Sequence, residues 1–297
     1  MAVPAVLRSV GATPGGRIGA IMIVAVALVA LVGPLVAPHP IDTPVGVPGS
    51  PPGPGIPLGT DALGRDVLSR FLDGGVSVIA ISVCATLLAY LAGVSIGMLA
   101  GLRRTWIDPL LMRGIDVLLA FPALLLMLVL VGGLGSAIPV LLLGVVLVQV
   151  PGIARVVRTA TQELSVLPFV ESARLRGERP LVICVREILP NLVSVIFADI
   201  GVRFGYAVVL VASMNFLNLG LQPPAADWGL MISENRSILA LNPWAVAAPA
   251  VPLALLVVGM NLVGDTVAAA AGRSAARGLD PAPDAALIPP HHRQEQP

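Results

Sequence analysis

Six long apolar stretches alternate with short polar segments along the chain. A helix needs about 20 mostly apolar residues to cross a bilayer, and each stretch is close to or above that length. The stretches cover residues 18–36, 76–102, 111–132, 136–157, 188–214 and 245–271. The pattern therefore predicts an all-α integral membrane protein with about six transmembrane helices.

The polar segment 155–187 interrupts this apolar pattern and carries six arginines and four glutamates. Its apolar residues recur close to helical spacing, at Leu164, Leu167, Val170 and Leu175. Gly177 then offers a place to turn, and Pro180 is tolerated in the first turn of a new helix. We expect helix, break and helix on one membrane face. The pattern supports equally a loop that only fixes topology and a docking surface.

The arginines are distributed unevenly between alternate connections. Fourteen fall in the terminal and connecting segments 1–17, 103–113, 155–187 and 272–297, whereas three fall in 37–75 and 217–243. Because arginine-rich connections stay in the cytoplasm, both termini and the polar segment are predicted to be cytoplasmic. This orientation is typical of a multi-pass protein of the bacterial inner or plasma membrane.

The same pattern divides the chain into four parts. Residues 1–17 form a cytoplasmic N-terminus, and 18–75 hold the first helix and an external loop whose Pro/Gly-rich stretch, 42–57, is expected to be an irregular spacer. The core, 76–271, holds five helices and the polar loop 158–187. The tail 272–297 is predicted to be disordered.

Composition strengthens the membrane assignment and excludes several kinds of chemistry. The chain is 56% hydrophobic and 12% charged, about half the charge typical of a soluble domain. It contains no lysine, which excludes a P-loop and lysine Schiff-base catalysis. Cys84, Cys184 and the three histidines form no metal-ligand pattern. We therefore expect no catalytic residue, no metal and no cofactor in this chain.

Two charged residues stand inside the fifth stretch. Asp199 and Arg203 are four residues apart, so they share one face of a helix near the middle of the membrane. Ionisable groups at that depth usually face a cavity or a partner. The pair is predicted either to line a translocation path or to form an ion pair that packs against another subunit.

Charged and turn-forming residues also gather in the external connections. Asp61, Arg65 and Asp66 alternate in sign among glycines, which favours a structural turn or a contact with an external protein over catalysis. Gln222 and Trp228 lie in the other external loop, and both are candidates for a contact with an external partner. The alternative for Trp228 is an anchor at the membrane interface.

A resemblance to a known family rests on five ordered motifs. The cytoplasmic loop of ABC importer permeases reads E-A-A, three residues, Gly, nine residues, then I-x-L-P. The residues of this chain on that frame are Glu171, Ser172, Ala173, Gly177, Leu189 and Pro190. Segments 57–70, 108–126, 215–231 and 261–267 resemble further motifs of the dipeptide and oligopeptide branch, which includes nickel importers. The chain resembles the second, or "C", permease subunit of that branch.

The resemblance implies a type I ABC importer permease bundle whose polar loop is a coupling helix. Its partners would be a homologous permease, two ATPase subunits that bind ATP and magnesium, and an extracytoplasmic substrate-binding protein. Peptides or related small solutes would be the cargo. The alternative is a secondary transporter driven by an ion gradient through Asp199 and Arg203.

Overall fold

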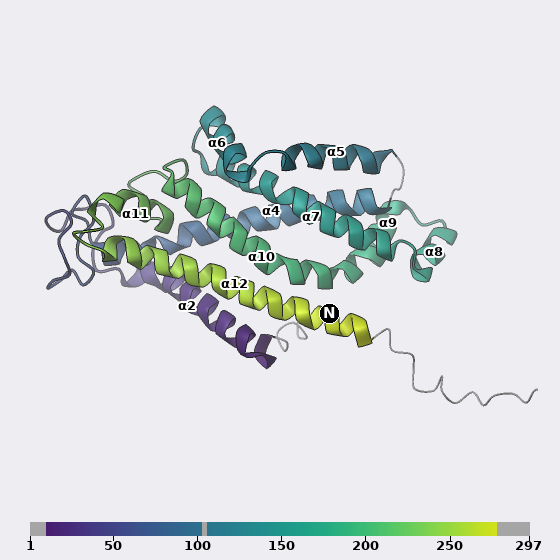
Figure 1. Cartoon of the computed structure of the whole chain (residues 1–297), viewed down its shortest axis with the longest axis horizontal. Coiled ribbons are helices and arrows are strands. Elements are labelled where there is room, and N and C mark those ends of the chain that lie inside the picture. Colours follow the sequence, from purple (N-terminus) through teal and green to yellow (C-terminus); the bar gives the residue numbers. More distant parts are fainter. Residues whose placement is uncertain (1–9, 103–105, 278–297) are drawn as a thin grey trace, which may run out of the picture.

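Long apolar helices run side by side along the molecule (Figure 1). The computed structural model describes residues 10–102 and 106–277. Five helices are long and apolar enough to cross a membrane, counting α3 with α4 and the turns before α10 with it. They are α2 (Pro14–Val36), α4 (Gly75–Leu102), α7 (Ile138–Leu164), α10 (Leu189–Phe216) and α12 (Trp244–Arg277). The described residues include isolated β-bridges but no strand, so the all-α prediction is confirmed.

The third predicted stretch is bent, so the expectation of one unbroken helix over 111–132 is wrong. It forms α5 (Ile107–Leu119) and α6 (Ala123–Leu134), which meet at 86°. Pro122 stands at the break. It lacks a backbone N–H and disfavours helical geometry at Phe121, which explains the bend. The described spans number six only if this bent pair is counted as one.

Several predicted boundaries also move. Helix α7 passes through Pro151 and ends at Leu164. Residues 158–164, the first part of the loop predicted over 158–187, are therefore helical. Helix α12 continues to Arg277, past the predicted start of the tail at 272. Residues 1–9 and 278–297, which contain most of the predicted terminal segments, lie outside the described residues.

Helices α4 and α7 pack in parallel because glycines let their backbones approach. An added Cβ at Gly93 would lie 2.7 Å from Ile153, and one at Gly97 would lie 2.7 Å from Val157. Gly101 meets Thr161 in the same way, at 2.6 Å. The constant offset of 60 residues shows that the two helices run in the same direction.

The two ends of the bundle differ (Figure 1). The loop end comprises residues 37–66, α3 (Val67–Asp73) and α11 (Trp228–Asn235). The elbow end comprises α8 (Pro168–Leu175), α9 (Pro180–Ile183) and a π-helical turn, Cys184–Ile188, that leads into α10. Each half of the bundle has its own buried apolar cluster.

Candidate functional site

The elbow is a short helix that ends in a glycine turn. Gly177 has a φ of +75°, a conformation that glycine adopts readily. The N–H of Glu178 donates to the carbonyl of Ala173 at 3.2 Å, and the N–H of Gly177 donates to Arg174 at 2.9 Å. This pair of bonds is the Schellman motif, which satisfies the last carbonyls of α8. The predicted order of helix, break and helix is therefore confirmed.

One face of α8 is buried and the other is open. Val170 and Ala173 are fully buried, in a cluster that also contains residues of α4, α7 and the start of α10. Glu171 and Ser172 are exposed on the opposite side, and the side chain of Leu175 is 84% exposed. The elbow is thus anchored to three long helices while it presents a mixed charged and apolar surface.

The remaining residues of the predicted loop motif lie in the second arm of the elbow, which follows Gly177 and comprises α9, the π-helical turn and the first turn of α10. Leu189 and Pro190 form the first turn of α10, directly after the π-helical turn. Pro190 cannot donate a backbone hydrogen bond, and the N–H of Leu189 donates to Cys184. Arg176 joins the two arms, with Glu178 at 2.8 Å and Glu187 at 3.6 Å.

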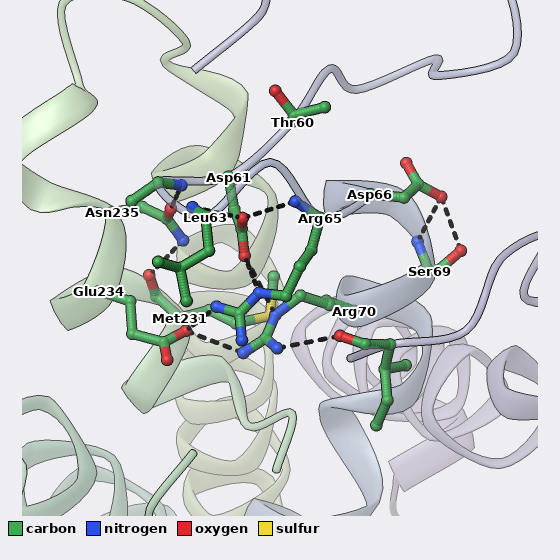
Figure 2. Close-up of polar contacts among 12 residues, drawn as sticks. Thr60, Asp61, Leu63, Arg65, Asp66, Ser69, Arg70, Met231, Glu234 and Asn235 are labelled. Atoms are coloured by element: carbon green, nitrogen blue, oxygen red, sulfur yellow. Dashed lines mark hydrogen bonds and ion pairs between the residues drawn. The ribbon is translucent and has the colours of Figure 1, made fainter. Parts of the chain in front are cut away.

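A buried ionic network holds the loop end together (Figure 2). The Nε of Arg65 donates to Asp61 at 2.6 Å, and its Nη2 donates to Glu234 of α11 at 3.0 Å. The Nη2 of Arg70 donates to the same Glu234 oxygen at 2.8 Å. Arg70 lies 3.5 Å from Asp61, so two arginines and two carboxylates balance each other. The network joins the Pro/Gly-rich loop to α3 and α11.

Neutral hydrogen bonds fasten the same loop. The N–H of Ala62 donates to the Asn235 side chain at 2.9 Å, and the Asn242 amide donates to the carbonyls of Leu58 and Thr60 at 2.9 and 3.0 Å. Asn235 and Asn242 are more than 160 residues away in the chain. The predicted spacer, 42–57, is irregular and packs against this fastened segment, with the N–H groups of Val45 and Gly49 donating to Gly64 and Asp61 at 2.8 and 2.9 Å.

Burial changes the interpretation of the residues predicted to contact an external protein. Asp61, Arg65, Asp66 and Trp228 are all buried, so their side chains hold the fold instead. Asp66 caps α3 by accepting from Ser69. Gln222 is exposed, and its contact with a partner stays a prediction.

Trp228 is packed inside the protein rather than placed at a membrane interface. Its indole N–H donates to the Phe71 carbonyl at 2.8 Å, and the two rings stack with centroids 6.0 Å apart. The neighbouring Asp227 caps α11 and accepts from the Ser77 hydroxyl at 2.6 Å. Burial raises the pKa of the Asp227 carboxyl despite these hydrogen bonds. The interface-anchor prediction for Trp228 is therefore wrong.

The charged pair of the fifth stretch lies together as its spacing predicts. The Nε of Arg203 donates to Asp199 at 3.1 Å. The Tyr90 hydroxyl, from α4, donates to the same carboxylate oxygen at 2.8 Å. Both charged side chains are 23% exposed. Three groups from two helices thus form a polar site within an apolar bundle.

Sequence reasoning missed three participants in these sites. Arg70 and Glu234 complete the ionic network, but they lie 164 residues apart and no local spacing connects them. Tyr90 gave a weak signal, since it is one of two tyrosines in the chain and lies inside an apolar stretch. A polar tip in such a place usually needs a partner.

Comparison with known proteins connects this architecture to transport. The family described as "Binding-protein-dependent transport system inner membrane component" matches residues 93–276, more than half of the chain. The chain belongs to this family. A glutathione transport system permease protein, GsiD, of Pectobacterium atrosepticum is 38% identical over 208 residues, covering 70% of this chain and 69% of the relative. The GsiD protein of an Escherichia coli strain has the same identity and coverage.

Solved structures support the fold of this importer permease. The MetNI methionine ABC transporter, in an inward-facing conformation, matches with a TM-score of 0.54 and 18% identity. The match covers 69% of this chain and 96% of the solved chain, and it shows the fold alone. The type I ABC importer permease fold is therefore confirmed. Family membership also identifies the chain as an ABC importer permease subunit, and nothing found supports the ion-gradient alternative.

Proposed function

We propose that this permease forms half of a translocation path for peptide-sized solutes and receives mechanical work from ATPase subunits at its elbow. The chain itself is non-catalytic, and ATP and magnesium are bound by its partners. The partners are a second, homologous permease, two ATPase subunits and an extracytoplasmic substrate-binding protein. Relatives that are named as glutathione transport permeases support a small peptide as cargo.

The open face of the elbow carries this proposal. Leu175 is 84% exposed at the end of α8, beside the exposed Glu171 and Ser172. Val166 and Leu181, at the same end, are 65% and 70% exposed, and several exposed apolar residues among polar ones are typical of a protein–protein contact. On the other face, Val170 and Ala173 belong to one cluster with α4, α7 and α10. A force applied at the elbow would therefore reach three membrane helices at once.

The cluster gives that force a route toward the middle of the bundle. It extends from Val170 in α8 to Ala89 and Tyr90 in α4. Tyr90 in turn holds Asp199, the partner of Arg203. Movement of the elbow would thereby change the packing around the pair that we place on the translocation path.

The orientation follows from the same proposal. The elbow lies in the cytoplasm, where fourteen arginines in the terminal and elbow-side segments favour it. The start of α2 lies beside the C-terminal part of α12, since the hydroxyls of Thr13 and Thr266 are 3.3 Å apart. Both termini are then cytoplasmic, and the loop end faces the substrate-binding protein.

The test replaces Leu175 with aspartate in the assembled transporter. The Leu175→Asp variant should lose most ATP-driven uptake and retain less ATPase on purification, because a charge would replace the apolar contact. Val47→Asp is the matched control for ATPase retention, since Val47 is 73% exposed at the loop end, away from the elbow. Full uptake with normal ATPase retention by Leu175→Asp would contradict the docking proposal.

A further inference from the structure

Arg203 presents an unused hydrogen-bonding surface. Its Nε is held by Asp199, and among the described residues neither terminal amino group has a hydrogen-bond partner. Those groups lie against Gly152 of α7, where an added side chain would collide with the guanidinium. Gly152 and Arg203 line one cavity of about 300 Å³, together with Phe121 and Tyr206. The guanidinium is thus oriented by Asp199, which Tyr90 holds, and the 23% exposed side chain of Arg203 lines this cavity.

This cavity lies near the middle of the bundle. Gly152 and Arg203 each lie fourteen residues after the first residue of their helices. That distance is about 21 Å along each axis, at about 1.5 Å per residue. The two helices run in opposite directions and are about 40 Å long, so the site is close to halfway along both.

A second arginine continues the polar surface toward the elbow. Arg155 follows Gly152 by three residues, so it lies near the same face of α7. Its Nη2 donates to Asp116 of α5 at 2.5 Å. The two side chains are 54% and 58% exposed, so they form an open polar surface on the elbow side of the cavity.

Lipid does not fit this surface. A charged side chain such as that of Arg203 is costly at the centre of a membrane helix, so such residues face an aqueous cavity or a protein. The exposed pair of Arg155 and Asp116 and the cavity at Arg203 lie on adjoining parts of α7. We therefore treat them as one water-facing surface and call it the arginine ladder, with Arg203 and Arg155 as its two steps.

We propose that the arginine ladder binds a carboxylate of the solute in transit, first at Arg203 and then at Arg155. This inference rests on the proposed transport function and deepens it, because it assigns the cargo a negatively charged group. A guanidinium binds a carboxylate through charge-assisted N–H bonds, and the terminal amino groups of Arg203 have no other hydrogen-bond partner among the described residues. Each arginine already has an aspartate beside it, so binding is weakened enough to permit release.

The test measures which charged reagent reaches the cavity. Phe121 lines it and is 53% exposed. Phe121→Cys is introduced into the full chain, with Cys84 and Cys184 replaced by serine, and the assembled transporter is studied in membrane vesicles. It is reacted with two methanethiosulfonate reagents, one bearing a sulfonate and one a trimethylammonium group. Leu28→Cys on the apolar helix α2 is the control for a lipid-facing position.

Both reagents should label Phe121→Cys much faster than Leu28→Cys. Adding Arg203→Gln should lower the ratio of anionic to cationic labelling on the order of tenfold, because it leaves Asp199 unbalanced. Asp199→Asn should shift the same ratio in the opposite direction. A folding defect would not produce opposite changes, and Arg203→Lys, which retains the charge, should keep a ratio near that of the parent.

Solute protection tests the chemical class of the cargo. Dialanine should slow labelling of Phe121→Cys, whereas dialanine amide, which lacks the carboxylate, should protect less. Labelling no faster than at Leu28→Cys, an unchanged ratio in Arg203→Gln, or equal protection by the two probes would overturn the proposal. These readouts need no ATP, so they can fail while ATP-driven uptake persists, and uptake can fail while they succeed.

Discussion

The two ends of this permease use the same charged residue types for opposite purposes. At the loop end, Arg65, Arg70 and Asp61 are almost fully buried, and both arginines pair with Glu234 across more than 160 residues of chain. At the elbow, Arg176 is 54% exposed and pairs with Glu178, two residues away. Burial therefore decides how much the ion pairs contribute to holding the fold, because water screens the elbow pair but does not screen the loop-end network. One end is held closed, and the other is left open to a partner.

The largest expected effect comes from breaking the buried network. Glu234→Gln leaves Arg65 and Arg70 facing only one carboxylate. Removing one member of a buried ionic group costs about 3 kcal/mol or more in the free energy of unfolding. Thermal unfolding of the purified transporter should show a clear loss of stability, with the 37–66 loop becoming more sensitive to protease.

Asp42→Asn is the matched control for this change. Asp42 is an exposed carboxylate in the same loop and forms no ion pair with any other described residue, so its loss should change stability by at most about 0.5 kcal/mol. Equal thermal stability of Glu234→Gln and Asp42→Asn would show that the network contributes nothing.

A smaller effect is expected from replacing a glycine with alanine, and the same substitution at the two ends separates the effect of backbone strain from that of position. Gly177 and Gly55 have φ values of +75° and +80°, and an added Cβ meets nothing within 4 Å at either residue. Alanine should therefore cost about 1–2 kcal/mol of local strain in both. Gly177→Ala should lower ATP-driven uptake and raise uncoupled ATP hydrolysis, since it distorts the elbow.

Gly55→Ala should carry the same strain without a loss of transport, because Gly55 lies at the loop end. The ratio of solute moved to ATP hydrolysed compares the two variants directly. If both variants reduced that ratio equally, the difference between the two ends would not extend to coupling.

The smallest effect is expected from the exposed elbow pair. Arg176→Gln removes the contacts with Glu178 and Glu187, but exposed pairs contribute about 0–1 kcal/mol. The thermal unfolding temperature should therefore shift little. A loss of stability less than a tenth of that expected for Glu234→Gln would be consistent with full screening of the pair. A loss as large as that of Glu234→Gln would instead indicate that the arms of the elbow depend on this pair.

Local patterns were sufficient for the helical bundle and for the elbow. The apolar stretches gave the long helices, and Gly177 with Pro180 marked the turn between α8 and α9. The spacing of Asp199 and Arg203 was enough to predict their shared face. These features depend on neighbours within a few residues, which the sequence displays directly.

Long-range packing was beyond such patterns. Hydropathy over 111–132 hid the bend at Pro122, because α5 and α6 taken together are apolar enough to pass for one membrane span. The charges near Asp61 looked like a solvent-facing turn until α11 brought Glu234 to them. Trp228 likewise looked like a membrane anchor, since its stacking partner, Phe71, is 157 residues away.

The glycines of α4 have a mechanical consequence. Contacts at Gly93, Gly97 and Gly101 bring α4 against α7 over two helical turns, with no side chain of α4 between them. Two rods joined so closely cannot slide or separate without losing that fit, so they should tilt as a single lever. When the bundle rocks, α4 and α7 would then move as one rigid unit rather than as two helices, and Tyr90 of α4 would move with that unit.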